Sequence, residues 1–408
     1  MRDNSFIALA REFTDDLFHC SRCNYCVEMI WEERGIHHVC PTLLHHNPAP
    51  SYSGKGYLAI ARALADGEEI SQSALVDRLF ACTTCGNCEQ VCPIGLKPAQ
   101  LVRALRADLV ANAMAPPEVL ALADRIAVTQ NPSGLPRSER YRWRESTGYE
   151  PDGPSNILYL PGCSACYGMA GEAAATLRVL TKIGFALRTL SAEQDRCCGA
   201  VLFEIGHLEM ARHQGRSTLD LIETSGASQI VTSSAECLEA LRHHYPSRLG
   251  RESKVPVVHA LELLHERLAS RKLNSRWVAR PSAPGTVALM DSCHLSKKSH
   301  GPLGEAGYPR IAREILASLG CRVFPDETAA AYAVCCGAAG GMPQLHPESS
   351  LRMARAKLDE LVQTGAEAIV CPSPLCAGQL RQANQSIAPV YGLFEFIDTF
   401  FESTEGGA

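Results

Sequence analysis

Hydrophobic positions follow a helical pattern in the first part of the chain and a strand-like pattern after residue 155. Apolar residues recur at helical spacing from Leu58 to Leu64 and again from Leu75 to Phe80. The stretch "PAQLVRALRADLVANAMAPPEVLALADRIAVTQNP", which begins at Pro98, predicts a helix, a Pro-Pro break and a second helix. We therefore expect a mostly helical N-terminal domain.

Short apolar runs after residue 155 predict β-strands that are each followed by a helix. "NILYL", beginning at Asn156, leads into "GEAAATLRVLTKIGFAL", a helical pattern for which Gly184 is a stop signal. "SQIVTSSAEC" repeats the change from strand to helix. Strands that alternate with helices favour a parallel sheet.

The same plan recurs from Pro284 onward. "TVALMDSCH" corresponds to "NILYLPGCS", "AVCCGAAGG" to "DRCCGAVLF", and "EAIVCPSPLCAGQLR" to "SQIVTSSAECLEALR". Two long copies indicate a duplicated domain rather than a solenoid. The predicted fold is α+β and multidomain, with a duplicated α/β domain built on small parallel sheets. We expect a helical domain over 1–132, a polar linker over 133–154, a first repeat over 155–280 and a second repeat over 281–400.

Composition narrows the class of protein. The 408 residues are 46% hydrophobic and 20% charged, as in an ordinary globular protein, and the net charge of -5 gives no reason to expect nucleic acid as a partner. The N-terminus lacks the apolar core of a signal peptide, and no apolar run approaches the ~18 to 20 residues of a membrane-spanning helix. We expect a soluble cytoplasmic protein that reaches a membrane only through a partner.

Nineteen cysteines are the dominant chemical feature. In a reducing cytoplasm disulfides are disfavoured, and clustered thiols usually bind metal. "CTTCGNCEQVCP" has the spacing of a bacterial ferredoxin [4Fe-4S] motif, in which the fourth cysteine ligates the neighbouring cluster. Zinc is the alternative, since it also binds Cys-x2-Cys.

"CSRCNYC", followed by Cys40-Pro41, is the companion motif, although 13 residues separate its third and fourth cysteines. An insertion before the fourth cysteine leaves both sites possible, because that cysteine serves the other cluster. We assign one cluster to Cys20, Cys23, Cys26 and Cys92, and the second to Cys40, Cys82, Cys85 and Cys88. The alternative is one intact cluster and one degenerate or zinc-filled site.

Each repeat offers a cysteine at a strand end, an adjacent pair and a later cysteine. The carboxyl ends of parallel strands meet at one edge of a sheet, where thiolates from separate loops can hold an iron-sulfur centre. The glycine after each pair allows the backbone to pass close to such a centre. The residues are Cys163, Cys197, Cys198 and Cys237 in the first repeat, and Cys293, Cys335, Cys336 and Cys376 in the second.

A two-cluster ferredoxin domain followed by two Cys-Cys-Gly repeats resembles the D-type subunit of heterodisulfide reductase and the iron-sulfur subunit of glycolate oxidase. In the reductases, repeats with five cysteines hold noncubane [4Fe-4S] clusters that split a disulfide. The first position of the family's final Cys-x2-Cys is Ser234 here in one repeat and Ser373 in the other. Cys166 and Cys371 are the extra cysteines that could supply a fifth thiolate, and Cys371 makes the second repeat the better candidate. A cubane, or no cluster, is the alternative.

Several other residues accompany the cysteines. His37, His38, His45 and His46 are expected in a surface loop or a partner interface, rather than as ligands. His207 and His346 follow the pairs, with helix capping as the simpler role and proton donation as the alternative. His294 and the lysines at 297 and 298 follow Cys293, where they could contact a cluster or offset its charge, or be solvated. Cys321 is expected in the core.

The resemblance implies an iron-sulfur electron-transfer subunit of a larger redox complex, an oxidoreductase component partnered with a flavoprotein or another redox subunit. The chain has no GxGxxG dinucleotide motif, so the substrate chemistry is expected on a partner. The implied cofactors are two [4Fe-4S] clusters, with one or two more, cubane or noncubane, in the repeats. The alternative is that the chain is itself a disulfide reductase with a noncubane cluster, or the iron-sulfur subunit of a 2-hydroxy-acid dehydrogenase.

Overall fold

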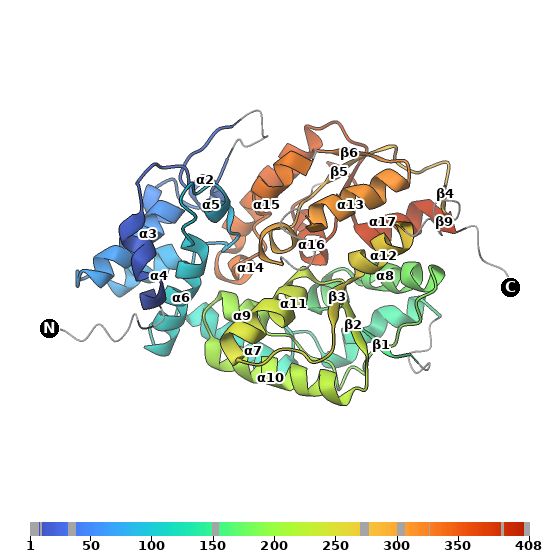
Figure 1. Cartoon of the computed structure of the whole chain (residues 1–408), viewed down its shortest axis with the longest axis horizontal. Coiled ribbons are helices and arrows are strands. Elements are labelled where there is room, and N and C mark those ends of the chain that lie inside the picture. Colours follow the sequence, from blue (N-terminus) through green and yellow to red (C-terminus); the bar gives the residue numbers. More distant parts are fainter. Residues whose placement is uncertain are drawn as a thin grey trace.

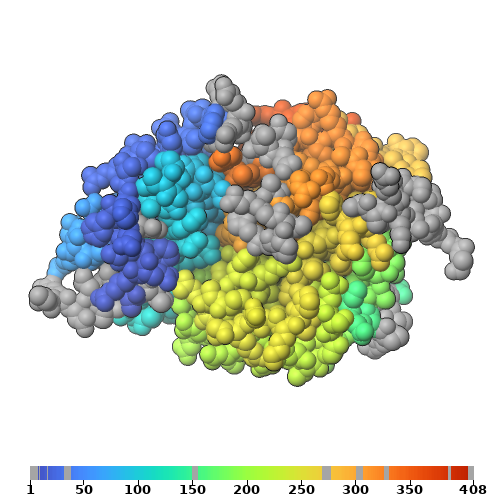
Figure 2. Space-filling model, in the orientation of Figure 1, coloured from blue at the N-terminus to red at the C-terminus, as the bar shows by residue number. Residues whose placement is uncertain are grey.

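The computed structural model describes residues 8, 10–31, 38–148, 155–269, 277–299, 307–325, 327–384 and 387–403. An N-terminal helical domain lies beside two α/β repeats, and it borders both of them (Figures 1 and 2). The expected fold class is confirmed. Among the described residues, no helix is long and apolar enough to cross a membrane.

The N-terminal domain is built from short helices around one hydrophobic core. They are η2 (Ala10–Phe13), α1 (Thr14–His19), α2 (Pro41–His45), η4 (Pro50–Tyr52), α3 (Gly54–Ala65), α4 (Gln72–Leu79), α5 (Asn87–Gln90), α6 (Pro98–Ala111) and α7 (Pro117–Thr129). Prolines occupy the first turns of α6 and α7, where a missing N–H does no harm. The predicted helix, break and helix are therefore confirmed. The apolar residues of α3 and α6 face each other in the core.

The first repeat is a small parallel sheet in the order β1-β2-β3. Its elements are β1 (Ile157–Leu160), η6 (Ser164–Gly168), α8 (Ala170–Lys182), α9 (Ala200–Glu204), α10 (Leu208–Thr224), β2 (Gln229–Thr232), α11 (Ala235–Glu239), η7 (Ala240–Leu249), β3 (Val257–His259) and α12 (Ala260–Ala269). An isolated parallel bridge joins Leu158 to Arg188 at the outer edge of β1. All three strands are short and mostly buried, which explains their continuous apolar runs.

The second repeat has the same topology with a full fourth strand, in the order β6-β5-β7-β8. Its elements are β5 (Thr286–Leu289), η8 (His294–Lys298), α13 (Gly307–Ser318), β6 (Arg322–Phe324), η9 (Glu327–Tyr332), α14 (Met342–Leu345), α15 (Pro347–Val362), β7 (Ala368–Cys371), α16 (Pro374–Ala383), β8 (Val390–Gly392) and α17 (Leu393–Phe400). A small antiparallel pair, β4 (Trp277–Ala279) with β9 (Phe401–Ser403), links the end of the chain to the segment between the repeats.

The last helix of each repeat packs against the first helix of the other repeat. Helix α17 lies against α8, and α12 lies against α13. The carboxylate of Glu172 on α8 accepts hydrogen bonds from the N–H groups of Phe394 and Glu395 at the start of α17. In the matching position, the hydroxyl of Tyr308 on α13 donates to Glu262 on α12 at 2.6 Å. The two repeats are therefore joined by reciprocal packing of these helices.

The polar segment expected as a linker over 133–154 is packed in its described part. Residues Arg137–Ser146 form a 3-10 helix (η5), and Arg140, Tyr141 and Trp143 are buried against the first repeat. Arg140 forms a buried ion pair with Asp195, at 2.6 Å between Nε and Oδ2. This stretch therefore belongs structurally to the first repeat, which its polar composition conceals.

Candidate metal centres

Five cysteines line a small cavity in the N-terminal domain. The outer set consists of four of them, Cys20, Cys23, Cys26 and Cys92, and the fifth is Cys88. Arg22 and Asn24 adopt left-handed backbone conformations (φ +56° and +69°), so the loop winds tightly around the cavity. Cys23 is exposed, and the N–H of Leu96 donates to Cys92 Sγ at 3.4 Å. Burial, followed by the charges of the neighbouring cysteines, raises the pKa of Cys26 to about 11.

A second group, the inner set, lies deeper and consists of Cys40, Cys82, Cys85 and Cys88. Burial raises the pKa of Cys40 to about 12 and that of Cys82 to about 11, and the charges of neighbouring set members oppose ionisation further. The N–H of Thr84 donates to Cys82 Sγ at 3.3 Å, while the amide of Asn87 donates to Val39 O at 2.9 Å. The Asn87 bond holds the inserted Cys40 segment against the loop. The structure thus brings these four thiols close to one another.

Gly54 lies between the two sets. A Cβ at this position would lie 2.8 Å from Cys88 Cβ and 3.1 Å from Cys26 Cβ. Gly54 begins α3, so the helix N-terminus enters the space between the two groups of thiols. The absence of a side chain allows the sets to approach each other.

The four predicted cysteines of each repeat also gather. In the second repeat, Cys293 Sγ lies 3.9 Å from Cys335 Sγ, and Cys336 Sγ lies 3.5 Å from Cys376 Sγ. Hydrogen bonds from Cys293 and Cys336 hold the pKa of Cys335 well below its usual value, and the N–H of Gly337 donates to the same sulfur. The first thiol of the adjacent pair is therefore the one that ionises most easily.

The first repeat reproduces this arrangement. Cys237 Sγ lies 3.2 Å from Cys198 Sγ, and hydrogen bonds from Cys163 and Cys198 lower the pKa of Cys197. The N–H of Gly199 donates to Cys197 Sγ at 3.4 Å. All described sulfur pairs are far longer than the ~2.05 Å of a disulfide bond, and all nineteen cysteines are free thiols.

The inner set directly contacts the second repeat. Cys85, Cys293, Cys335 and Ala339 form one buried cluster of side chains. Burial, and then the charge on Cys335, raises the pKa of Cys85. The cysteines are thus arranged in a sequence from the outer set, through the inner set, to the second repeat.

The two serines that replace family cysteines lie at helix N-cap positions, and of the two only Ser234 makes a cap hydrogen bond. Ser234 precedes α11, and its Oγ accepts a hydrogen bond from Cys237 N at 3.1 Å. Ser373 is fully buried ahead of α16 and donates to Glu236 at 3.3 Å. Cys371 is the last residue of β7 and lies in the core beside Cys376. Burial, followed by the charge on Cys376, raises the pKa of Cys371. Cys166 is buried one turn after Cys163, where burial raises its pKa to about 12.

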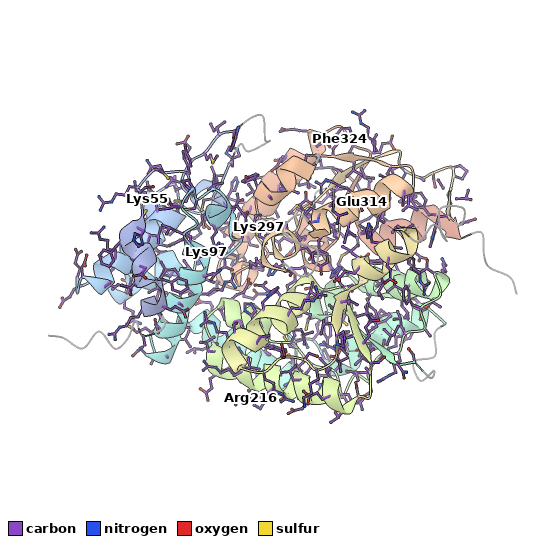
Figure 3. All side chains as sticks on the ribbon, viewed as in Figure 1. Lys55, Lys97, Arg216, Lys297, Glu314 and Phe324 are labelled. Carbon is purple, nitrogen blue, oxygen red and sulfur yellow. The ribbon has the colours of Figure 1, made fainter. Side chains whose placement is uncertain are left out.

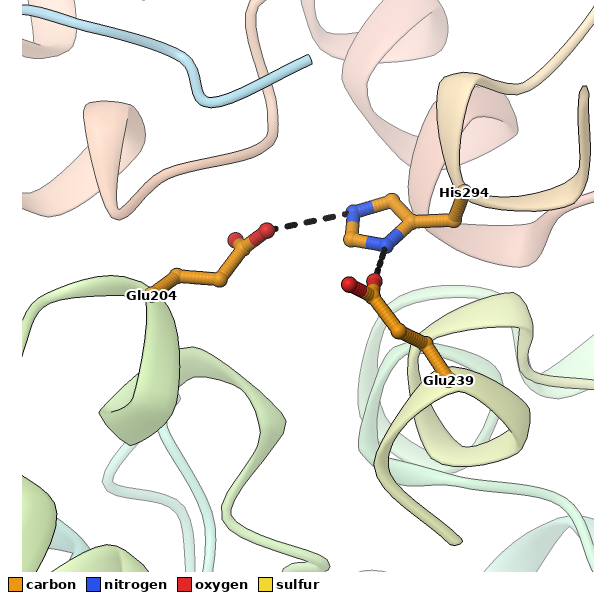
Figure 4. A group of neighbouring side chains, drawn as sticks. All are labelled: Glu204, Glu239 and His294. Carbon is orange, nitrogen blue, oxygen red and sulfur yellow. Dashed lines mark hydrogen bonds and ion pairs between the residues drawn. The ribbon is translucent and has the colours of Figure 1, made fainter. Parts of the chain in front are cut away.

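A buried ionic group joins the two repeats near these thiols. His294 Nδ1 lies 2.5 Å from Glu239 Oε2, and its Nε2 lies 3.9 Å from Glu204 (Figure 4). Lys298 Nζ lies 2.5 Å from Glu204 Oε1, and Arg103 pairs with Glu239 at 3.3 Å. The solvated interpretation of the two lysines is wrong, because both are buried. Lys297 lies at the boundary between the N-terminal domain and the second repeat, and donates to Ala333 O (Figure 3).

Sequence reasoning missed Glu204 and Glu239, since most of their partners lie in other domains, although His244 of the same repeat also contacts Glu239 at 3.2 Å. Glu204, Glu239 and His294 are close enough to hold a metal ion. However, Lys298 and Arg103 already neutralise the two carboxylates, so a dication would leave an excess of buried positive charge. The group is better described as an ionic junction between the repeats.

The remaining histidines lie mostly at helix ends and domain boundaries. His207 precedes α10 and His346 precedes α15, as the capping interpretation expected, although neither side chain makes a cap hydrogen bond. His46 contacts Ser349 of the second repeat, while His38 is exposed. His37 lies outside the described residues. Cys321 is buried ahead of β6, which confirms its expected place in the core.

The cysteines present fit iron-sulfur clusters in donor type and number. Thiolates are the usual ligands of such clusters, and hydrogen bonds from backbone N–H groups to the sulfurs are a common way of tuning them. Each of the four groups brings together four thiols, and the outer set surrounds a cavity. Histidine and carboxylate ligands, which other metals prefer, are not part of any of the four groups as described.

Comparison with known proteins places these features in a family. Residues 16–96 match the family described as "4Fe-4S dicluster domain", and residues 157–242 and 287–381 match "Cysteine-rich domain". Together the matched ranges cover more than half of the chain.

Three curated relatives align with most of this chain. The chain is 28% identical to a subunit of the dihydromethanophenazine:CoB--CoM heterodisulfide reductase of Methanosarcina acetivorans, over 91% of this chain and 90% of the relative. It is 27% identical to the "EtfAB:quinone oxidoreductase" of Syntrophomonas wolfei, over 88% of this chain and 54% of that protein. It is 25% identical to a subunit of the fumarate reductase (CoM/CoB) of Methanothermobacter marburgensis, over 91% of this chain and 68% of the relative.

The expected family is therefore confirmed, and with it the chemistry of iron-sulfur electron transfer with multiple [4Fe-4S] clusters. With a dicluster domain followed by two cysteine-rich domains, the chain belongs to the superfamily of the D-type heterodisulfide reductase subunits.

Proposed function

We propose that the chain is the subunit of a redox complex in which the outer set receives or delivers electrons at a partner protein, and the second repeat is the inner terminus. The observation that carries the order is the burial of Cys85 together with Cys293 and Cys335. When bound to these cysteines, [4Fe-4S] clusters supply one-electron transfer. The fold of the chain sets the spatial order of these clusters.

The same geometry supports the cysteine roles that we propose. The outer set (Cys20, Cys23, Cys26, Cys92) and the inner set (Cys40, Cys82, Cys85, Cys88) each hold one cluster. The second repeat holds a third through Cys293, Cys335, Cys336 and Cys376, with Cys371 beside Cys376 as a fifth thiol. The first repeat offers an equivalent group in Cys163, Cys197, Cys198 and Cys237.

The exposed position of Cys23 supports contact between the outer set and a partner. Tyr25 and Ile94 line the same cavity and leave 44% and 47% of their surface exposed. We propose a flavoprotein or another iron-sulfur subunit as this partner, in the cytoplasm, with any membrane association made through the complex. Protein complexes that transfer electrons need only small interfaces, and the exposed surface around this cavity is suited to an interface of that size.

Anaerobic iron and sulfide analysis with EPR tests the proposal. About eight irons per chain correspond to the two sets of the N-terminal domain alone, and about 12 to 16 include the repeats. We expect Cys82→Ser to remove the inner cluster and Cys336→Ala to remove the third. Cys321→Ala is the matched control, because Cys321 is a buried core thiol, and it should keep all iron. Zinc in place of iron in anaerobic protein would contradict the proposal.

Disulfide reduction by the chain itself is the second candidate function. It is favoured by the fifth thiol of the second repeat, Cys371, which lies beside Cys376. A cavity of about 650 Å³ lies between the N-terminal domain and the repeats, lined by Gly86, Arg103, His244 and Lys298 among others and by none of the described cysteines. Such a volume suits a small substrate. A disulfide-dependent paramagnetic species that disappears in Cys336→Ala would support this function. If the protein transfers electrons but does not reduce any disulfide, its function is electron transfer alone.

A further inference from the structure

Arg106 is a fully buried cation where all three parts of the chain meet. It lies on α6 and is 0% exposed. Its Nε donates to Leu79 O at 2.9 Å, and its Nη2 donates to Cys82 O at 2.5 Å. Its Nη1 donates to Glu204 O at 2.9 Å and to Gly340 O at 3.0 Å. One guanidinium group thus links the loop that contains Cys82 to both repeats through hydrogen bonds.

Glycines bring the three backbones into direct contact around Arg106. At Gly340 (φ +70°) a Cβ would lie 2.6 Å from Cys82 O, and at Gly206 (φ +82°) it would lie 2.5 Å from Ala107 N. Gly340 thus allows the backbone of the second repeat to approach the Cys82 loop closely. The Glu204 carboxylate completes the junction, since it accepts from Gly340 N at 2.7 Å and from Thr84 Oγ1 at 3.1 Å.

The positive charge of Arg106 lies beside the inner set. Its four hydrogen-bond acceptors are neutral carbonyl groups, and one of them belongs to Cys82 itself. In a site this dry, charges interact far more strongly than in water. Reduction adds one negative charge to a cluster, with no bond made or broken, so a neighbouring cation favours the reduced form.

We propose that Arg106 is a positioning residue that raises the reduction potential of the centre at Cys82 and fixes its spacing to the second repeat. The proposal rests on the proposed function, in which Cys40, Cys82, Cys85 and Cys88 hold a [4Fe-4S] cluster. The two effects come from separable properties. The positive charge of Arg106 sets the reduction potential of the inner centre. The planar guanidinium group donates to four carbonyl groups at once and so sets the distance between the inner centre and the second repeat.

Anaerobic redox titration monitored by EPR tests the charge effect in the full chain. In Arg106→Gln, the equilibrium constant for reduction of the inner centre should fall at least about tenfold, which is ~59 mV for one electron. The outer centre should keep its potential. Arg106→Lys keeps the charge, so the inner centre should stay within about threefold of wild type. Arg125→Gln, at an exposed arginine on α7, is the matched control and should change neither centre.

Gly340→Ala tests the spacing effect, because it keeps the charge but forces the backbone of the second repeat away from Cys82. Magnetic coupling between the inner centre and the second repeat should weaken, while the inner potential stays unchanged. Unchanged coupling in a protein with full iron would overturn the spacing effect.

An Arg106→Gln protein with full iron and two unchanged potentials would overturn the charge effect. If the Arg106→Gln protein does not retain the inner cluster, the Arg106→Lys protein provides the test. A tenfold change in the equilibrium constant for reduction of its inner centre would overturn the proposal. Failure of the proposed function looks different, because Cys82→Ser would then keep every cluster signal of the wild-type protein.

Discussion

The imidazole rings of His46 and His346 pack edge to face across the boundary between the N-terminal domain and the second repeat, with their centroids 4.7 Å apart. His46 Nδ1 lies 2.9 Å from Ser349 Oγ, and the guanidinium of Arg352 donates to His45 O. Burial lowers the pKa of both rings, and it lowers that of His346 to about 4. Both imidazoles are therefore neutral in the folded protein at pH 7.

Acidification should weaken this boundary. Because the folded pKa of His346 lies below its ordinary value of 6.5, the unfolded chain binds more protons between pH 6.5 and 4. The stability that neutral His346 contributes is present above pH 6.5 and is lost as the pH falls through 4. We expect the midpoint of urea unfolding to fall between pH 7.5 and pH 5, and to fall less in His346→Gln. His213→Gln, at an exposed histidine on α10, should keep the wild-type dependence.

Gly54→Ala should prevent normal cluster assembly in the N-terminal domain. The added Cβ would lie 2.8 Å from Cys88 Cβ, so the two sets of cysteines must move apart. Iron and EPR signals of the anaerobic protein should fall in at least one set. Gly285→Ala, where a Cβ meets nothing within 4 Å, should keep full iron. Equal iron in both variants would show that the sets tolerate wider spacing.

Removing Asp195 should destabilise the first repeat strongly. Asp195 accepts hydrogen bonds from Arg140 Nε at 2.6 Å and from the hydroxyl of Tyr141 at 2.7 Å, and all three side chains are buried. Asp195→Ala leaves a buried guanidinium without its carboxylate, which typically costs about 3–5 kcal/mol of unfolding free energy. Asp66→Ala removes an exposed pair with Arg62 and should cost less than about 0.5 kcal/mol. Chemical denaturation measures both values.

Ser234→Ala should lower stability without loss of iron. Its hydroxyl caps α11, and loss of such a cap costs about 1 kcal/mol. Ser373→Ala should cost less, because Ser373 makes no cap hydrogen bond. Iron analysis of both variants checks that neither serine is a ligand, and a loss of iron from either one would make that hydroxyl part of a cluster site.

The local pattern of residues along the chain predicted much of this fold. The features that it did not predict depend on burial by segments that are distant in the sequence. The strands that end near Cys163 and Cys293, and the grouping of the eight N-terminal cysteines, follow from periodicity and spacing that a few neighbouring residues carry. Arg140 and Lys298 look like surface residues in sequence, since nothing nearby shows that Asp195 or Glu204 will neutralise them. The role of Gly340 was also hidden, because its neighbour is the backbone of Cys82, more than two hundred residues earlier.

The reciprocal packing of α12 and α17 has the geometry of a two-fold dimer interface whose two copies are joined in one chain. Each final helix packs on its own sheet and also on the first helix of the other repeat, so each repeat presents helix surface that only the other half covers. A polypeptide that carried a single repeat would have to cover this surface with a second molecule. The pseudo-symmetry of this protein is thus that of a homodimer, with the N-terminal domain breaking the equivalence of its two halves.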